Sequence, residues 1–225
     1  MTTDIRAECD TGKDTAINRA LFRELGLTAI GICSAPRAGK TTILERTLPL
    51  LKDEFRVAVL ETDLHPALDA RRIRSAGAPV WQIITGNDYP ADASMVAEAL
   101  RQFPLARTQI LFIERLIDPD ESSLPDWGED VRVIVYRVPP ASVLPANMPN
   151  LLRAADAVLV NTMDCPPGKG IDEKAIAAVR QANHDAAVFG LHRPAQDNLT
   201  PWVGWLRQRI RLLLSGQARG AEISG

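Results

Sequence analysis

The apolar segment Leu27-Thr28-Ala29-Ile30-Gly31-Ile32-Cys33 and the loop after it, Ser34-Ala35-Pro36-Arg37-Ala38-Gly39-Lys40-Thr41-Thr42, decide the fold of this 225-residue chain. The first segment is typical of a strand buried on both faces. Residues 40 to 52 repeat apolar side chains at helical spacing, so the loop joins a strand to a helix. The end of the loop matches the phosphate-binding pattern G-x-x-x-x-G-K-[ST], with Ser34 in place of the first glycine. We therefore expect the nine residues from Ser34 to Thr42 to bind a nucleotide.

Each part of this loop has a chemical task in a nucleotide site. Backbone N–H groups of the loop and of the helix N-terminus can surround phosphate oxygens. We expect Lys40 to neutralise the β- and γ-phosphates and the Thr41 hydroxyl to ligate Mg²⁺. The competing interpretation is an ordinary strand-turn-helix that contains Gly-Lys-Thr by chance, and the incomplete motif alone does not decide between the two.

The rest of the chain alternates short apolar runs with amphipathic stretches. The runs are nearly continuous, as expected for parallel strands covered by helices on both faces. The sequence thus predicts an α/β fold of the P-loop NTPase type, with a doubly wound, mostly parallel sheet of about six to seven strands in a single domain. We place an N-terminal extension at residues 1–12, the domain at 13–214 and a disordered tail at 215–225. The expected strands are 27–33, 56–61, 79–84, 109–114, 132–136, 157–161 and 187–191, and the expected helices are 40–52, 65–76, 92–103, 172–183 and 202–214.

Two acidic residues are expected at the same edge of the sheet as the loop. Asp63 comes just after the second strand, and Glu114 ends the fourth. A simpler interpretation makes each a solvated acid at a strand end. Their combination with Thr41 favours ligands of Mg²⁺ and water, so we assign Thr41 and Asp63 to Mg²⁺ and Lys40, Asp63 and Glu114 to catalysis.

The segment Asn161-Thr162-Met163-Asp164 is similar to the N-K-x-D base-recognition motif of guanine-nucleotide proteins. Asp164 can accept hydrogen bonds from the N1–H and the 2-amino group of guanine, a pair of donors that adenine does not offer together. We therefore assign Asn161 and Asp164 to nucleotide binding, with GTP as the ligand. Thr162 replaces the lysine whose stem covers the base, which keeps ATP open as an alternative.

Composition argues against several other classes of protein. Lys and Arg number 26 against 28 Asp and Glu, and the net charge is -2. Nucleic-acid and membrane partners favour a marked basic excess, so we expect neither. No apolar run is long enough for a membrane span, the N-terminus has no signal-peptide pattern, and three scattered cysteines do not suggest a disulfide framework. We expect a cytoplasmic protein, and we interpret the acidic segment from Asp118 to Asp130 as a solvated loop.

Taken in order, these features resemble the GTPases that assist nickel insertion into [NiFe]-hydrogenase, which belong to the SIMIBI class of P-loop proteins. The similarity is collinear from about Lys13 to about Leu206. The resemblance implies a GTP-driven switch that dimerises, carries nickel or zinc near its switch loops, and delivers metal together with hydrogenase-maturation proteins. Besides the motifs above, it rests on segments 18–19, 44–48, 56–59, 61–64, 69–73, 77–79, 82–83, 85–86, 92–96, 111–114 and 128–130 and on Trp202, Trp205 and Leu206.

The chain departs from this family at the residues that would hold the metal. Tyr89-Pro90 stands where the family has a Cys-His pair, and the family's third ligand, a cysteine, has no counterpart in residues 114–122. Tyrosine is a poor ligand for nickel or zinc, and proline has no side-chain donor. We therefore assign no nickel or zinc ligands. Ile117 replaces the switch glycine, Arg37 replaces a loop glycine, and residues 192–196 replace the last guanine-contacting segment.

The combined expectation is a Mg²⁺–GTP-binding protein of hydrogenase maturation that hydrolyses GTP slowly. Its expected partners are GTP, a second copy of the chain, and hydrogenase-maturation proteins or the hydrogenase large subunit. The alternative is a non-hydrolytic paralogue that serves as a nucleotide-binding scaffold or partner in the assembly of a hydrogenase or another metalloenzyme. Measuring nucleotide affinity together with turnover separates the two.

Overall fold

The computed structural model describes residues 11–63, 69–85, 91–117, 123–138, 148–162, 173–191 and 199–223, without the side chains of 11, 63, 69 and 218–223. Helices and strands alternate along the chain, which is the pattern of an α/β fold. The helices are α1 (Thr11–Glu24), α2 (Lys40–Leu51), α3 (Asp69–Ser75), α4 (Ala93–Gln102), α5 (Met148–Arg153), α6 (Glu173–Ala182) and α7 (Thr200–Ile223). The strands are β1 (Thr28–Ser34), β2 (Val57–Asp63), β3 (Val80–Ile84), β4 (Ile110–Leu116), β5 (Val131–Arg137), β6 (Ala157–Asn161) and β7 (Ala187–Leu191).

The strands form one seven-stranded sheet in the order β3-β2-β4-β1-β5-β6-β7. Every neighbouring pair is parallel, and β1 lies in the middle between β4 and β5. The strand order therefore runs outward in both directions from β1, and this confirms the predicted doubly wound sheet. Ligands in such sheets bind outside the carboxyl ends of the strands, near the point where the order reverses.

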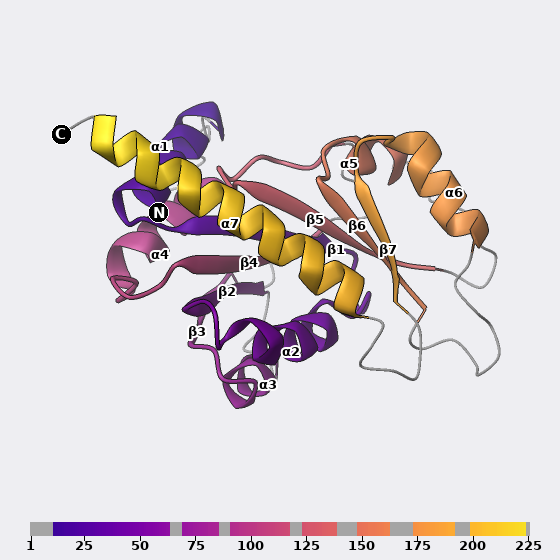
Figure 1. Cartoon of the computed structure of the whole chain (residues 1–225), viewed down its shortest axis with the longest axis horizontal. Helices are drawn as coiled ribbons and strands as arrows, with labels where there is room; N and C mark the ends of the chain where they lie inside the picture. Colours follow the sequence, from indigo (N-terminus) through magenta and orange to yellow (C-terminus); the bar gives the residue numbers. More distant parts are fainter. Residues whose placement is uncertain are drawn as a thin grey trace, which may run out of the picture.

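Helices cover both faces of the sheet. On one face, α2, α3 and α7 pack on alternate residues of β1 and β5, and Figure 1 shows α7 running diagonally across this face. The other face carries α1 and α4 over β1, β2 and β4, and α5 and α6 over β5 and β6. Burial on both faces explains why the strands read as continuous apolar runs.

The connection between β4 and β5 corrects one expectation, because residues 123–130 are not a solvated loop. Leu124, Trp127 and Glu129 are buried. The Trp127 ring lies under the Arg115 guanidinium, at 4.8 Å from its centroid, and Trp127 N–H donates to the Glu129 carboxylate at 2.8 Å. Apolar side chains between the acidic ones anchor this segment on the sheet. Residues 118–122 lie outside the described part of the chain.

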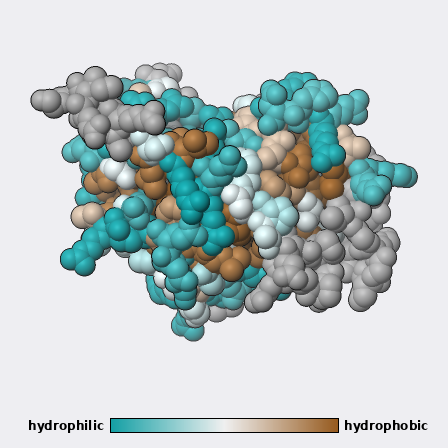
Figure 2. All heavy atoms as spheres, in the orientation of Figure 1, coloured by the Kyte–Doolittle hydropathy of each residue, from teal (hydrophilic) through white to brown (hydrophobic). Residues whose placement is uncertain are grey.

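The C-terminal helix also extends further than predicted. The sequence places the end of the ordered domain at residue 214, but α7 continues to Ile223. Leu213 and Leu214 pack against the core, and the Gln217 side chain donates to the carbonyl oxygen of Leu27 at 3.1 Å. These contacts continue the helix across the sheet. In Figure 2, hydrophilic residues follow the outer side of α7, with hydrophobic residues beside them.

The N-terminal boundary of the domain also differs from the prediction. Helix α1 begins at Thr11, inside the segment assigned to an extension, so the predicted boundary at residue 13 falls within a helix. Among the described helices, none combines the length and the apolar character that crossing a bilayer requires.

Candidate functional site

The loop between β1 and α2 lies at the carboxyl edge of the sheet, beside the central strand. Gly39 precedes α2 with φ of 97°, a left-handed conformation that favours glycine. A Cβ atom at this position would lie 2.4 Å from Nδ2 of Asn161, so glycine is required on steric grounds as well. The first intrahelical bond runs from Ile43 N–H to Gly39 O, which leaves the earlier N–H groups directed out of the helix end. Such an end is a favourable position for an anion.

Asn161 holds this loop from the end of β6. Its side chain is buried, and Nδ2 donates to the carbonyl oxygen of Ala38 at 2.7 Å. The structure therefore brings Asn161 to the phosphate loop, and its assignment to nucleotide binding stays a prediction. This hydrogen bond to the loop backbone helps to fix the loop conformation.

Four polar side chains meet where α2 begins. Lys40 Nζ donates to Ser34 Oγ at 3.1 Å and lies 3.7 Å from Oε1 of Glu114. Thr41 Oγ1 donates to the same Glu114 oxygen at 3.2 Å. All four residues are buried, so the Glu114 carboxylate balances the Lys40 ammonium in a region of low polarity. A phosphate–metal complex that enters this site meets a lysine, a hydroxyl and a carboxylate already gathered in one place.

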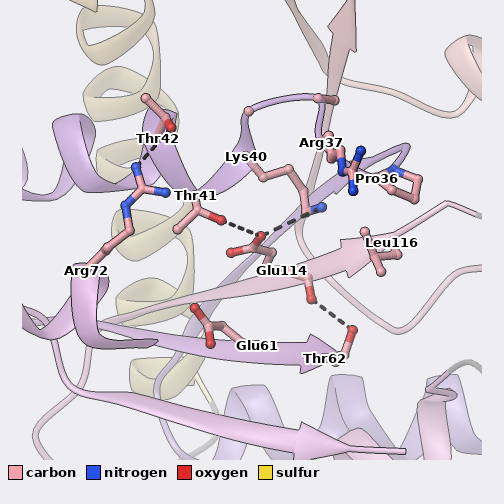
Figure 3. A pocket seen from close by; sticks show the side chains of 12 residues that line it. Pro36, Arg37, Lys40, Thr41, Thr42, Glu61, Thr62, Arg72, Glu114 and Leu116 are labelled. Carbon is pink, nitrogen blue, oxygen red and sulfur yellow. Dashed lines mark hydrogen bonds and ion pairs between the residues drawn. The ribbon is translucent and has the colours of Figure 1, made fainter. Parts of the chain in front are cut away.

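A pocket of about 360 Å³ opens in front of this cluster. Figure 3 shows that its labelled side chains come from the loop, α2, α3, β2 and β4. Sequence reasoning missed Glu61 in β2 and Arg72 in α3 as members of this site. The lining residues are Pro36, Arg37, Ala38, Gly39, Lys40, Thr41, Thr42, Glu61, Thr62, Arg72, Glu114 and Leu116.

The two missed residues are held by neighbouring elements. Glu61 is buried, and its Oε2 accepts a hydrogen bond from the Gln82 side chain of β3 at 2.9 Å. Arg72 Nη2 donates to Thr42 Oγ1 at 3.0 Å. A signal for Glu61 exists in the sequence, since an acid inside an otherwise apolar run needs a buried partner or a ligand. Arg72 has no such signal, because exposed arginines are common in helices.

The donor set fits a magnesium ion. Mg²⁺ prefers oxygen ligands from hydroxyl, carboxylate and phosphate groups and keeps several waters. The Thr41 hydroxyl and the Glu114 carboxylate supply two such oxygens within hydrogen-bonding distance of each other. No nitrogen or sulfur ligand lies among the pocket residues, which agrees with a hard cation.

Arg37 has a left-handed backbone conformation with φ of 59°, which is unfavourable for a residue with a side chain. Its side chain is exposed at the pocket, and its carbonyl oxygen accepts a hydrogen bond from Arg137 Nη1 at 3.2 Å. Position 37 therefore has the left-handed backbone conformation that glycine adopts most easily, and the Arg37 side chain adds a cation to the pocket.

Some predicted residues cannot be placed at this site. Asp63 is the last residue of β2, and its side chain is not among those described. Asp164 and Tyr89-Pro90 lie outside the described residues. Ile117, which the sequence comparison above sets in place of the switch glycine, is buried, and its N–H donates to Ser34 O at 2.8 Å. Within the described part of the chain, no group of three or more His, Cys, Asp or Glu side chains is arranged to hold a metal ion.

Residues 28–190 match the protein-family model described as "CobW/HypB/UreG, nucleotide-binding domain". The chain is 35% identical to hydrogenase maturation factor HypB of Escherichia coli (strain K12) over 190 residues, 84% of this chain and 66% of the relative. It is 35% identical to the HypB of Azotobacter vinelandii over 215 residues, 92% of this chain and 71% of the relative. The chain thus spans about two thirds of the length of these curated relatives.

Solved structures agree with this result. The crystal structure of HypB from Archaeoglobus fulgidus is similar with a TM-score of 0.74 and 25% identity, over 89% of this chain and 98% of that one. HypB from Helicobacter pylori, crystallised in complex with nickel, has the same TM-score at 24% identity and supports the fold alone.

Proposed function

Because this chain belongs to the CobW/HypB/UreG family of nucleotide-binding domains, we propose that it binds GTP with Mg²⁺ and hydrolyses it slowly in the service of hydrogenase maturation. The observation that carries this proposal is the convergence of Lys40, Thr41 and Glu114 on one pocket at the carboxyl edge of the sheet. These side chains come from different elements, β4 and the start of α2, so a chance Gly-Lys-Thr turn does not account for them.

The side chains divide the work as phosphoryl transfer requires. Loop N–H groups and the N-terminus of α2 bind phosphate oxygens, and Lys40 neutralises the charge of the terminal phosphates. Thr41, together with Asp63 or Glu114, would hold Mg²⁺, which would neutralise charge on the phosphates. Glu114 orients the attacking water. Slow turnover follows, because positioning and charge neutralisation supply the whole rate enhancement in the absence of an added activator.

The names of the relatives extend the proposal to a biological setting. Several are called hydrogenase maturation factors, and identity reaches 35% over most of this chain. We propose that the protein acts in the cytoplasm as a dimer with other hydrogenase-maturation proteins or the hydrogenase large subunit. We propose that the protein itself carries no nickel, because Tyr89-Pro90 stands where the family has a Cys-His pair. Equilibrium dialysis against Ni²⁺ tests this point, and one equivalent bound tightly would contradict it.

The decisive experiment compares Lys40→Ala with Lys52→Ala, which removes an exposed lysine from the other end of α2. Single-turnover GTP hydrolysis and GTP affinity are measured with Mg²⁺ for each variant. We expect Lys40→Ala to lower the rate by about 100-fold or more, since removing a preorganised charge from a transition state costs that much. Lys52→Ala should match the wild type. An unchanged rate in Lys40→Ala removes this pocket as the site of hydrolysis.

The same measurements decide between hydrolysis and binding alone, and between the two bases. Tight GTP binding without turnover places the chain with the non-hydrolytic paralogues. Competition by ATP at equal concentration is expected to be weak, and preferential binding of ATP would remove the role given to Asp164.

A further inference from the structure

Arg72 of α3 lines the nucleotide pocket but has no role in the function proposed above. Its guanidinium makes three recorded contacts with α2: Nη2 donates to Thr42 Oγ1 at 3.0 Å, and Nε and Nη2 donate to Glu45 Oε2 at 3.2 and 2.6 Å. Arg72 also lines the nucleotide pocket, and Figure 3 shows it beside Thr42, on the opposite side of Thr41 from the Lys40 amine. Besides Lys40 and Arg37, the pocket therefore has a further cation on the side away from Lys40.

Thr42 connects this cation to the phosphate position. Thr42 is the third residue of α2, and the first intrahelical bond begins only at Ile43 N–H. The Thr42 N–H is therefore one of the groups at the helix end that a phosphate oxygen accepts from. Because the Thr42 hydroxyl belongs to the same residue, a guanidinium at 3.0 Å from that hydroxyl also lies next to a phosphate bound there.

Glu45 explains why the guanidinium stays in this place. It lies one turn further along α2, on the same side of the helix as Thr42. The Arg72–Glu45 pair is half-exposed on both sides, with side-chain exposures of 39% each. Such a half-exposed pair adds little stability by itself, so a gain in stability does not explain why Arg72 is held here.

We propose that Arg72 is a phosphate-binding residue contributed by α3, which Glu45 holds in position. This inference rests on the proposed nucleotide function and names a further residue of the same site. Lys40 covers the β- and γ-phosphates, and the backbone cradle holds the α- and β-phosphates. Arg72 lies beside Thr42 at the N-terminus of α2, where the phosphates common to GDP and GTP would bind, so it contributes to the binding of both nucleotides.

The test uses three substitutions, of which only Arg72→Ala is expected to weaken nucleotide binding. Arg72→Ala weakens the binding of both GDP and GTP about tenfold, the effect of losing one charge-assisted hydrogen bond. Glu45→Gln leaves an acceptor for the guanidinium but removes a negative charge, so affinity stays equal or rises. Arg71→Ala, an exposed arginine next along the same helix, has no effect. Affinities are measured with fluorescent GDP and GTP at low and high salt, and circular dichroism checks the fold of each variant.

The outcomes separate the possible roles. If the Arg72–Glu45 pair only holds α3 against α2, Arg72→Ala and Glu45→Gln should weaken nucleotide binding equally. That result would overturn the proposal. Wild-type affinity in folded Arg72→Ala would also overturn it. Absence of nucleotide binding in the wild-type protein instead rejects the proposed function, because Lys40→Ala and Arg72→Ala then have nothing to change.

Discussion

A single residue, Asn161, helps to set the conformation of the whole phosphate loop. Its amide reaches from the end of β6 to the Ala38 carbonyl, across 123 positions of sequence. The same amide nitrogen would lie 2.4 Å from a Cβ at position 39, so a side chain there would displace the Asn161 amide from its place. The loop conformation therefore depends on a strand that lies two places away from β1 in the sheet.

Replacing Asn161 by alanine is expected to lower the free energy of unfolding by about 1–3 kcal/mol, the cost of leaving a buried carbonyl without its donor. The control is Asn150→Ala, which removes an exposed side chain that bonds Arg153 at the surface. Urea unfolding of both variants gives the comparison. Equal stability of the two variants would mean that the Asn161 bond contributes nothing to the loop.

Glu129 gives a second residue-scale prediction, in its dependence on pH. Burial raises the pKa of the Glu129 carboxyl above its ordinary value of 4.5, and the opposing effects of Trp127 N–H and Arg132 are smaller. Since the folded state holds this proton more tightly than the unfolded state, the stability that Glu129 contributes is complete below pH 4.5. It is lost as the pH rises through the raised pKa.

The measurement is the urea midpoint of the wild type and Glu129→Gln from pH 4 to pH 8. The glutamine keeps an oxygen for Trp127 N–H, so the variant should lose less stability than the wild type as the pH rises. Glu98→Gln, an exposed substitution in α4, should follow the wild-type curve. Parallel curves for all three proteins would show that burial of Glu129 has no energetic consequence.

The candidate site was only partly predictable from the sequence. Lys40 and Thr41 follow from a local motif, and Glu114 from its place near a strand end. Glu61 and Arg72 join them because β2 lies beside β4 and α3 packs on α2, which are long-range facts that a motif does not contain. The roles assigned to Asp63 and Asp164 stay predictions.

At the scale of elements, the strands were easier to predict than the first helix. All seven predicted strands occur, because burial on both faces leaves continuous apolar runs. Helix α1 was missed because its buried face carries Thr15 and Asn18. The Asn18 side chain donates to the carbonyl oxygens of Ala93 and Trp127 at 2.8 and 3.0 Å. Polar side chains that satisfy buried backbone groups hide the apolar period on which a helix prediction depends.

The prediction at the scale of elements concerns the stability that the last turns of α7 contribute. Gln217→Ala removes the hydrogen bond to Leu27 O, and we expect a loss of about 1 kcal/mol in the free energy of unfolding. Gln208→Ala changes an exposed glutamine two and a half turns earlier on the same helix and should have no effect. If both variants match the wild type, the last turns of α7 add no stability to the domain.

At the scale of the whole molecule, the predicted resemblance to the nickel-insertion GTPases is confirmed by the family match and the HypB relatives. The match covers the whole sheet, because residues 28–190 contain all seven strands apart from the last residue of β7. In the sheet, β2 and β4 lie beside the loop that follows β1, and residues of these three segments line one pocket.

Because that pocket joins separate elements, nucleotide binding should stabilise the molecule as a whole. A ligand that binds only the folded state at 100 times its Kd adds about 2.7 kcal/mol. For a domain of this size the expected rise in Tm is roughly 5 to 10 °C. Thermal unfolding is measured with GTP and Mg²⁺, with GDP, and without nucleotide. Lys40→Ala should lose most of the rise, whereas Lys52→Ala should keep it. A Tm that does not depend on GTP concentration in the wild type would contradict nucleotide binding to the folded domain, whatever the fate of individual site residues.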